Sequence, residues 1–397
     1  MPARLHSIKV RNYRCLRDVV VPTGPINVLF GPNGVGKTTF LDALWFVRDC
    51  AIRGTDAAAS TRHHGIGVLW DGAEPEDRIE ISLETSTAEY AISFGFSSGR
   101  IEPFVGERFR SKARNLTLIE RAMGSAEADF YHESLQQMTR IKLREPEKPA
   151  FSNYLLFTEP VPETAGLDEI LHAVHLYASR SANFFQLRRL GSESTQHTFL
   201  YDRWQNLWSA LRNLHDRRAL DERYDTILGY MRKGFPEAFR DLVFDQLGPD
   251  RVYASFLEVN RRQPIAASGV SDGHLQFLGL LTALFGMPPN RAATAIFDEP
   301  ETSLHPHAIA VFAEAAKFAA TAWGRQIFIA THSPVLMSQF SLSESFVFES
   351  DAQRSTVPKR ASEMADLTDL LNHYSLGSLY MAEEVAPQSG EKKNAEQ

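Results

Sequence analysis

The clearest chemistry in the sequence lies in residues 31–38. They fit the pattern G-x-x-x-x-G-K-[ST] and read Gly31-Pro32-Asn33-Gly34-Val35-Gly36-Lys37-Thr38. Glycines let the backbone curl so that consecutive N–H groups face one anion, and the start of the following helix adds its positive end. The lysine then reaches the terminal phosphates and the threonine hydroxyl binds Mg²⁺. The motif predicts a triphosphate site made by residues 31–38 together with Thr39.

A pair of acids at the end of an apolar segment is the second candidate. Residues 294–299 read TAIFDE, which is a buried-strand pattern ending in Asp298 and Glu299. Asp298 is placed to support Mg²⁺, directly or through water, and Glu299 is the candidate general base for an attacking water. A strand can end in acids for structural reasons alone, but the phosphate loop upstream favours the catalytic interpretation.

Two further segments carry candidate ligands of a phosphate. His332 follows the apolar run 326–330, and its ring could donate a hydrogen bond to the γ-phosphate or to the attacking water, although a lone histidine is often structural. Ser271, Asp272 and Gly273 open an apolar helix, and a helix start with small residues attracts an anion. An ordinary capped helix after a turn explains this second segment equally well.

Hydrophobic patterning supplies the elements that would position these residues. Short apolar runs at 5–10, 18–30, 251–259, 294–299 and 326–333 indicate strands, and 78–84 with 89–96 indicate a hairpin. The stretch 40–50 and the Ala-rich stretch 307–322 show helical spacing. We therefore expect an α/β fold with a mixed sheet, in which two lobes are split in sequence by a largely helical insertion.

The expected organisation has four segments. They are 1–100 (lobe I with the phosphate loop), 101–245 (the mainly helical insertion), 246–345 (lobe II with the remaining motifs) and 346–397 (a C-terminal tail). Two apolar stripes in the insertion predict helices that face the core. They are Leu167, Ile170, Leu171, Val174 and Tyr177, and then Leu200, Trp204, Leu207, Trp208, Leu211 and Leu214.

Composition excludes several classes of protein. The chain has 397 residues, 43% of them hydrophobic and 23% charged, as in globular proteins, and no stretch approaches the roughly 18 apolar residues of a membrane span. Its start lacks the apolar region of a secretory signal, and the two cysteines, Cys15 and Cys50, form no metal or disulfide pattern. We expect a cytoplasmic protein. The net charge of −7 excludes a uniformly basic nucleic-acid binder but not a local basic patch.

These motifs, in this order, resemble those of the ATP-binding-cassette (ABC) ATPases, and VSDGH at 270–274 is similar to their LSGGQ signature. Within that superfamily the sequence resembles the SMC-related branch, in particular RecF-like proteins and the ATPase part of the OLD (overcoming lysogenization defect) family. The segments that carry this are IKVRNYRCLRD, INVLFGPNGVGKTT and IFDEPETSLHP. The resemblance covers about residues 1–50 and 265–340 specifically.

The resemblance implies a P-loop NTPase fold of ABC type that hydrolyses ATP with Mg²⁺. It also implies a homodimer in which ATP lies between the phosphate loop of one subunit and Ser271–Gly273 of the other. Binding would close this dimer and hydrolysis would open it. By the same analogy, Arg14 or Asn12 would lie near the base or the phosphates.

The sequence also departs from the family pattern. Asp272 replaces the first glycine of the signature, and His305 stands where many ABC ATPases carry the aspartate of the D-loop. The Q-loop glutamine is not assignable, because Gln136 and Gln137 lie too late in the chain and His63 and His64 lie near its usual place. The rate of hydrolysis and the communication between subunits therefore stay open.

DNA is the substrate that the resemblance implies. Arg108, Arg110, Lys112 and Arg114 alternate without an intervening acid, so on a strand they would project to one side and contact phosphates. A solvated surface is the competing interpretation. OLD-family nucleases carry a TOPRIM domain after the ATPase, for which residues 346–397 are too few, so we expect any effector nuclease in a partner chain.

The expected function is thus an ATP-hydrolysing, RecF/OLD-like ATPase whose nucleotide-driven dimerisation regulates DNA repair or anti-phage defence. Two alternatives stay open. One is a switch that senses ATP without turnover, which a phosphate-release assay distinguishes. The other is the motor subunit of an ABC transporter, which would co-purify with a membrane protein.

Overall fold

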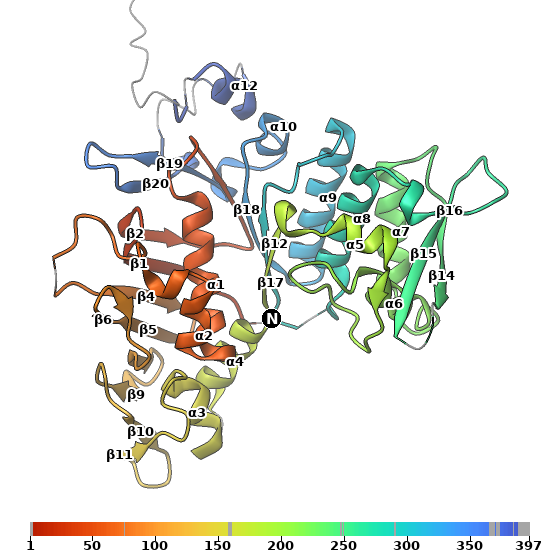
Figure 1. The fold of residues 1–397 in the computed structure, drawn as a ribbon. Coiled ribbons are helices and arrows are strands. Elements are labelled where there is room, and N and C mark those ends of the chain that lie inside the picture. Colours follow the sequence, from red (N-terminus) through yellow and green to blue (C-terminus); the bar gives the residue numbers. More distant parts are fainter. Residues whose placement is uncertain are drawn as a thin grey trace, which may run out of the picture.

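A computed structural model describes residues 3–74, 76–157, 161–246, 248, 250–289, 291–364, 370, 374–383 and 385–387. Its largest sheet has eight strands, all paired antiparallel in the order β11-β10-β9-β8-β5-β4-β1-β2. The strands are β1 (Ser7–Tyr13), β2 (Leu16–Pro22), β4 (Ile79–Glu84), β5 (Ala88–Phe94), β8 (Gly106–Ser111), β9 (Leu116–Arg121), β10 (Glu127–His132) and β11 (Gln137–Lys142). This sheet forms the left part of the molecule in Figure 1.

A second sheet of six strands runs through the centre of the molecule in the order β12-β17-β18-β3-β19-β20 (Figure 1). Its strands are β12 (Val174–Ala178), β17 (Thr294–Asp298), β18 (Gln326–Ala330), β3 (Ile26–Phe30), β19 (Ser345–Ser350) and β20 (Thr356–Arg360). The first five are parallel and β20 is antiparallel. Because parallel strands end at one edge, the segments that follow β3, β12, β17 and β18 meet there.

The described residues also form two smaller sheets. One contains β13 (Ser192–Glu193), β15 (Arg251–Leu257), β14 (Asp241–Gln246) and β16 (Ile265–Ala266), and the other contains β6 (Phe96–Ser97) and β7 (Arg100–Ile101). The first of them packs with the helices on the right of Figure 1.

The structure describes helices α1 (Lys37–Arg53), α2 (Thr55–Ser60), α3 (Ala150–Phe157), α4 (Pro162–His172), α5 (Phe184–Arg189), α6 (Leu207–His215), α7 (Arg223–Gly234), α8 (Asp272–Phe285), α9 (Pro306–Ala322), α10 (Pro334–Met337) and α12 (Leu376–Met381). Of these, α1 packs on one face of the central sheet and α8 and α9 pack on the other. Among the described residues, none of the helices is long and apolar enough to cross a membrane.

The central strands are apolar on both faces, and alternate residues enter different cores. Ile296 of β17 and Phe328 of β18 pack in one core with α1 and the antiparallel sheet. Phe297 and Ile329, one position further along, pack in the other core with α8 and α9. The predicted α/β class with a mixed sheet is therefore confirmed.

The expectation of a mainly helical insertion is wrong for its first part. Residues 106–142 form β8 to β11, and helices begin only with α3. The segments GERFRS and EADFYH of β8 and β10 alternate buried and more exposed residues, which is a strand pattern. The insertion thus extends the antiparallel sheet before it contributes helices.

Four other expectations need correction in detail. The run 18–30 is not one strand, because Thr23–Pro25 separate β2 from β3. Val174 and Tyr177 do not continue the stripe of α4; they lie in β12. The run 251–259 does not join the expected mixed sheet, because it forms β15 of the smaller sheet that also contains β13, β14 and β16. The start of the expected tail forms β19 and β20 of the central sheet, and residues 388–397 of that tail lie outside the described residues.

Candidate functional site

The phosphate loop lies between β3 and α1, as the motif requires. Gly36 has a φ of 108°, and a Cβ there would come within 2.4 Å of Thr356 Oγ1 and 2.9 Å of Cys15 Sγ. The side chain of Lys37 folds back over the loop and donates to the carbonyl oxygens of Gly31 and Pro32, both at 2.8 Å. Burial lowers the pKa of Lys37 to about 8. The loop is therefore tightly curved, and the ammonium group of Lys37 lies against its backbone carbonyl groups.

Thr38 and Asp298 meet, although 260 positions separate them in sequence. Thr38 Oγ1 donates to Asp298 Oδ1 at 2.8 Å, because α1 starts beside the end of β17. Asp298 is 4% exposed, and burial raises the pKa of its carboxyl group. A hydroxyl and a carboxylate of this kind are the oxygen donors that Mg²⁺ prefers.

Arg180 and Ser179 are functional candidates that the sequence did not reveal. Both follow β12, the neighbour of β17 in the sheet. Arg180 Nη2 lies 3.2 Å from Asp298 Oδ2, and Ser179 Oγ donates to the carbonyl oxygen of Glu299 at 2.7 Å. Gln276 Nε2 of α8 in turn donates to Ser179 Oγ at 2.6 Å. Their position directly after a parallel strand could have revealed them, but the sequence analysis assigned residues of β12 to a helix.

Glu299 stands at the same edge with its carboxylate exposed. Its φ is 53°, and its N–H donates to Ala330 O of β18 at 2.9 Å. Among the described residues, none donates a hydrogen bond to the Glu299 carboxylate. The side chain is therefore available to a water molecule beside the phosphate loop.

Glu301 is a second acid that the sequence did not reveal. Its Oε1 accepts hydrogen bonds from Thr331 Oγ1 at 2.6 Å and from the N–H of His332 at 3.1 Å. Burial raises the pKa of Glu301. The signal was in the run DEPET, where a third acid, Glu301, lies two residues after Glu299.

His332 is connected to the phosphate loop through Tyr380. Its Nδ1 is 3.5 Å from Tyr380 Oη, and that hydroxyl donates to Gly31 O at 3.2 Å. Burial lowers the pKa of His332. The sequence did not single out Tyr380, which connects α12 to the phosphate loop.

The start of α8, which carries the candidate residues Ser271, Asp272 and Gly273, has its own set of contacts. Asp272 forms an ion pair with Arg188 of α5, at 2.6 Å, so its carboxylate is neutralised and does not cap the helix. Ser271 Oγ lies 2.7 Å from His274 Nδ1. A Cβ on Gly273 would come within 2.7 Å of Ser303 O. Within the described residues, no hydrogen bond joins Ser271–Gly273 to the phosphate loop of the same chain.

Arg14 and Asn12, which the family analogy places near the base or the phosphates, have different contacts. Cys15, in the turn after Arg14, lies beside Gly36, and Arg14 Nη1 is 3.5 Å from Asp42 of α1. Asn12 instead donates to Arg78 O at 3.1 Å. His305 precedes α9 and accepts from the N–H of His307.

The candidate Q-loop residues also have other contacts. Gln136 lies in the turn between β10 and β11 and accepts from Tyr131 Oη at 2.9 Å, and Gln137 begins β11. His63 and His64 lie in a short 3₁₀ turn after α2.

The four basic residues expected on one strand are not all on it. Arg108 and Arg110 are exposed on β8, but β8 ends at Ser111, so Lys112 and Arg114 lie beyond it. Arg108 is 3.2 Å from Glu120. The other three contact Asn115, Glu84 and the pair Glu133 and Glu163, respectively. Local partners therefore reduce the positive charge of this surface.

Comparison with known proteins agrees with this geometry. Residues 26–338 match the family AAA_21, described as "AAA domain, putative AbiEii toxin, Type IV TA system". The chain is 23% identical over 405 residues to the OLD nuclease of Thermus scotoductus, covering 95% of this chain and 68% of that protein.

Among solved structures, the SMC head bound to the C-winged helix domain of ScpA matches with a TM-score of 0.50 at 11% identity. The match covers 90% of this chain and 99% of that one. The SMC head of Pyrococcus furiosus with an extended coiled coil gives a TM-score of 0.49 at 11% identity, over 93% and 100% of the two chains.

The family match spans most of the chain, the phosphate loop and the acidic strand end adjoin as such a fold requires, and the architecture is that of an SMC head. The chain therefore belongs to the AAA_21 family, has the fold of an SMC head and is similar in sequence to an OLD nuclease.

Proposed function

We propose that the protein binds ATP with Mg²⁺ and hydrolyses it to ADP and phosphate. The observation that carries this proposal is the 2.8 Å hydrogen bond between Thr38 and Asp298. It brings the hydroxyl of the phosphate loop and the carboxylate of the acidic strand to one point, beside the ammonium group of Lys37. Phosphoryl transfer depends mainly on such positioning of cations and donors.

The residues present fit a magnesium ion. The Thr38 hydroxyl and the Asp298 carboxylate would hold Mg²⁺, and Arg180 on the second oxygen of Asp298 supports the view that this carboxylate accepts a cation. Bound Mg²⁺ neutralises the charge that develops on the phosphates. The loop N–H groups and Lys37 bind and orient the phosphates in this proposal.

Glu299 is the proposed general base, because its carboxylate is exposed at the site and engaged by no described donor. It accepts a proton from the attacking water. The lowered pKa of His332 keeps its imidazole neutral near pH 7, so one ring N–H donates a hydrogen bond to the γ-phosphate or the water. Glu301 positions His332 through its backbone N–H.

We further propose a homodimer in which the start of α8 from one subunit contacts ATP on the other. The exposed Ser271 and the neutralised Asp272 support this proposal. Because Arg188 balances the Asp272 carboxylate, the helix N-terminus keeps its preference for an anion.

The dimer cycle is proposed to regulate a DNA-related process, DNA repair or anti-phage defence, with any nuclease in a partner chain. The similarity to an OLD nuclease supports this proposal. The contribution of the basic surface is tested by an alanine variant of Arg108, Arg110, Lys112 and Arg114. A salt-sensitive DNA affinity that this variant loses supports the surface, and unchanged binding removes it.

A phosphate-release assay on the purified protein tests the enzymatic proposal. The parent protein should release phosphate from ATP, and Lys37→Ala should lose affinity for ATP at the phosphate loop. Glu299→Gln should bind ATP but turn over at least about 100-fold more slowly, since the general base is removed. If Glu299→Gln keeps full activity, the assignment of the base is wrong. If the parent binds ATP without turnover, the protein is a nucleotide-sensing switch.

A further inference from the structure

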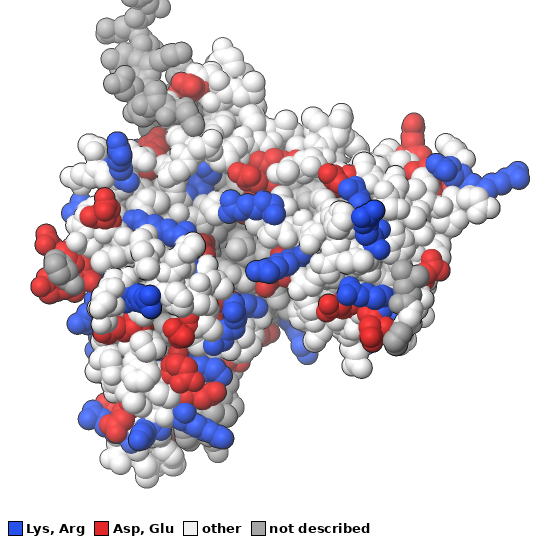
Figure 2. All heavy atoms as spheres, viewed as in Figure 1, with Lys and Arg blue, Asp and Glu red and all other residues white. Residues whose placement is uncertain are grey.

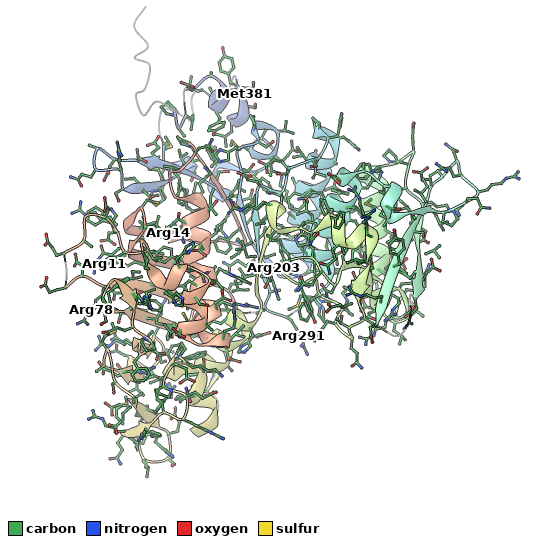
Figure 3. The ribbon with its side chains drawn as sticks, viewed as in Figure 1. Arg11, Arg14, Arg78, Arg203, Arg291 and Met381 are labelled. Atoms are coloured by element: carbon green, nitrogen blue, oxygen red, sulfur yellow. The ribbon has the colours of Figure 1, made fainter. Side chains whose placement is uncertain are left out.

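A cavity separate from the phosphate loop lies between α1 and the segment 197–205. It has a volume of about 810 Å³ and is open to solvent. One wall is α1, represented by Trp45, Arg48 and Arg53, and the other is the segment 197–205. In Figure 3 the labelled Arg203 lies between the part that carries α1 and the helical part. Residues 31–39 do not line this cavity.

Aromatic rings form one wall. His197, Phe199 and Tyr201 alternate along an extended segment and all line the cavity. The ring centroids are 4.9 Å apart for His197 and Phe199 and 5.6 Å apart for Phe199 and Tyr201. The ring of His175 from β12 lies 5.4 Å from that of Phe199. This cluster offers flat π-surfaces of the kind on which a nucleobase stacks.

The backbone of this aromatic wall is held in place. Asn206 donates to Phe199 O at 2.9 Å and accepts from the N–H of Tyr201 at 2.8 Å. Asn213 donates to His197 O at 2.9 Å. A ligand would therefore meet a prearranged surface and would not have to order a loop.

The carboxylates that line the cavity are already paired. Asp49 lies 3.0 Å from Arg48 and 3.4 Å from Arg62. Asp202 lies 3.1 Å from Nδ1 of His175. Asp49 is therefore balanced by two guanidinium groups, and the Asp202 carboxylate is engaged by the His175 ring.

Two arginines of the cavity carry positive charge without a counterion. Arg53 and Arg203 are exposed, and neither has a carboxylate partner within the described part of the chain. Figure 2 shows Lys and Arg side chains around the middle of this face, where the two parts of the molecule meet. Free guanidinium groups of this kind bind phosphate by bidentate hydrogen bonds.

We propose that this cavity is a second nucleotide site, distinct from the ATPase site. The base stacks on His197, Phe199 or Tyr201, and the phosphate binds Arg53 and Arg203. The volume lies in the usual range of small-ligand sites, about 300–1,000 Å³. Two free guanidinium groups fit a mononucleotide or dinucleotide, whereas a longer strand needs a continued basic track. The proposal goes beyond ATP hydrolysis and does not require it.

The site is placed to regulate the ATPase. The α1 wall begins at Lys37 and Thr38 of the phosphate loop, and β12 leads from His175 to Ser179 and Arg180. A ligand between them would contact both elements that converge on Asp298. Occupancy should therefore change ATP turnover, in addition to being measurable as binding.

The test uses the full chain and two probes, AMP and the dinucleotide ApA, by isothermal titration calorimetry. Lys37→Ala serves as the background because it disables the phosphate loop. In that background both probes should bind, and adding Arg203→Ala should weaken binding about tenfold or more through loss of a charge-assisted contact. Arg291→Ala removes another exposed arginine outside the cavity (Figure 3) and should leave the affinity unchanged.

The base is tested by ribose 5-phosphate and by Phe199→Leu, which keeps an apolar side chain but removes the ring. Ribose 5-phosphate should bind to the Lys37→Ala protein at least several-fold more weakly than AMP does. Adding Phe199→Leu to that protein should weaken its affinity for AMP by a similar factor. Equal affinity of ribose 5-phosphate and AMP overturns the nucleotide assignment. Absence of AMP and ApA binding at millimolar concentration overturns the site, and a ten-nucleotide strand that binds far more tightly than ApA overturns the small-ligand form of the proposal.

Photo-crosslinking of the parent protein with 8-azido-AMP keeps the test valid if Lys37→Ala does not fold. Peptide mapping should find the label in residues 197–203, and a label confined to residues 31–39 contradicts the proposal. If the parent protein does not hydrolyse ATP but is still labelled in residues 197–203, the proposed ATPase function is wrong and the second nucleotide site stands.

Discussion

Glu301 shows how one side chain can organise a catalytic edge without contacting the reacting atoms. Its buried carboxylate ties Thr331 and the backbone of His332 to the segment after β17. Its second oxygen has no hydrogen-bond partner among the described residues. The position of His332 therefore depends on an acid other than Glu299, the proposed general base.

Replacing Glu301 tests this positioning role. Glu301→Ala leaves a buried hydroxyl and an N–H without a partner, so we expect a loss of about 1–3 kcal/mol in unfolding free energy. We also expect kcat to fall about tenfold or more while KM for ATP changes little. Glu301→Gln keeps an acceptor oxygen and should recover most of both quantities. Urea denaturation and steady-state kinetics measure them, and equal kcat in Glu301→Ala and the parent would contradict the role.

At the scale of elements, the junction between β3 and α1 depends on two glycines in different ways. Both Gly34 and Gly36 have positive φ, 75° and 108°. Nothing lies within 4 Å of a Cβ on Gly34, whereas a Cβ on Gly36 would collide with Thr356 and Cys15. Only the second glycine is required by the packing of β20 and the β1–β2 turn against the loop.

The two alanine variants should therefore differ. Gly34→Ala incurs backbone strain of about 1 kcal/mol, and Gly36→Ala adds overpacking for a total of about 2–4 kcal/mol. The difference in unfolding free energy between the two variants, from urea denaturation, measures the packing contribution. Equal losses would mean that the loop yields without resistance at Gly36.

Another junction joins α7, the end of α8 and the segment that bears the aromatic wall. Arg223 donates to both carboxylate oxygens of Asp221, to Thr198 Oγ1 at 3.0 Å and to Gly286 O. The hydrogen bonds from Arg223 lower the pKa of Asp221. Asp221 thus stabilises the fold only while it is ionised.

This pair predicts a pH dependence. Because the folded pKa of Asp221 lies below the unfolded value of about 3.9, its contribution is complete above that pH and is lost as the pH falls through the folded pKa. Asp221→Asn should lower the unfolding free energy by about 1–2 kcal/mol at pH 7. The gap between parent and variant should narrow below about pH 4. A gap that is constant from pH 7 to pH 3 would show that ionisation of Asp221 has no part in it.

At the scale of the whole molecule, the proposed ATP site has two parts that lie on different segments of the chain. The phosphate loop, Asp298 and Glu299 form one cluster, while Ser271 lies at the exposed start of α8. In the proposed dimer, one chain supplies the surface that receives the nucleotide and the second copy supplies Ser271.

This arrangement predicts an ATP-dependent change of mass. Glu299→Gln with ATP should sediment as a dimer, because ATP remains bound. Adding Ser271→Glu places a carboxylate beside the partner's triphosphate and should shift the species to monomer while each chain still binds ATP. Sedimentation velocity with a parallel ATP titration measures both effects. A dimer that is unaffected by Ser271→Glu would contradict the proposed interface.

The sequence by itself determined the local chemistry of Gly31–Thr38 and of Asp298 and Glu299. The residues that flank these two segments also determine β3, α1 and β17. The spacing of residues in the sequence is therefore enough to identify both segments. It did not determine Arg180, Glu301 or Tyr380, because their partners come from other strands and helices. The tertiary structure also decided that Arg108, Arg110, Lys112 and Arg114 meet local acids and an amide, whereas Arg53 and Arg203 have no carboxylate partner among the described residues. Charge balance depends on neighbours in space, and only folding supplies those neighbours.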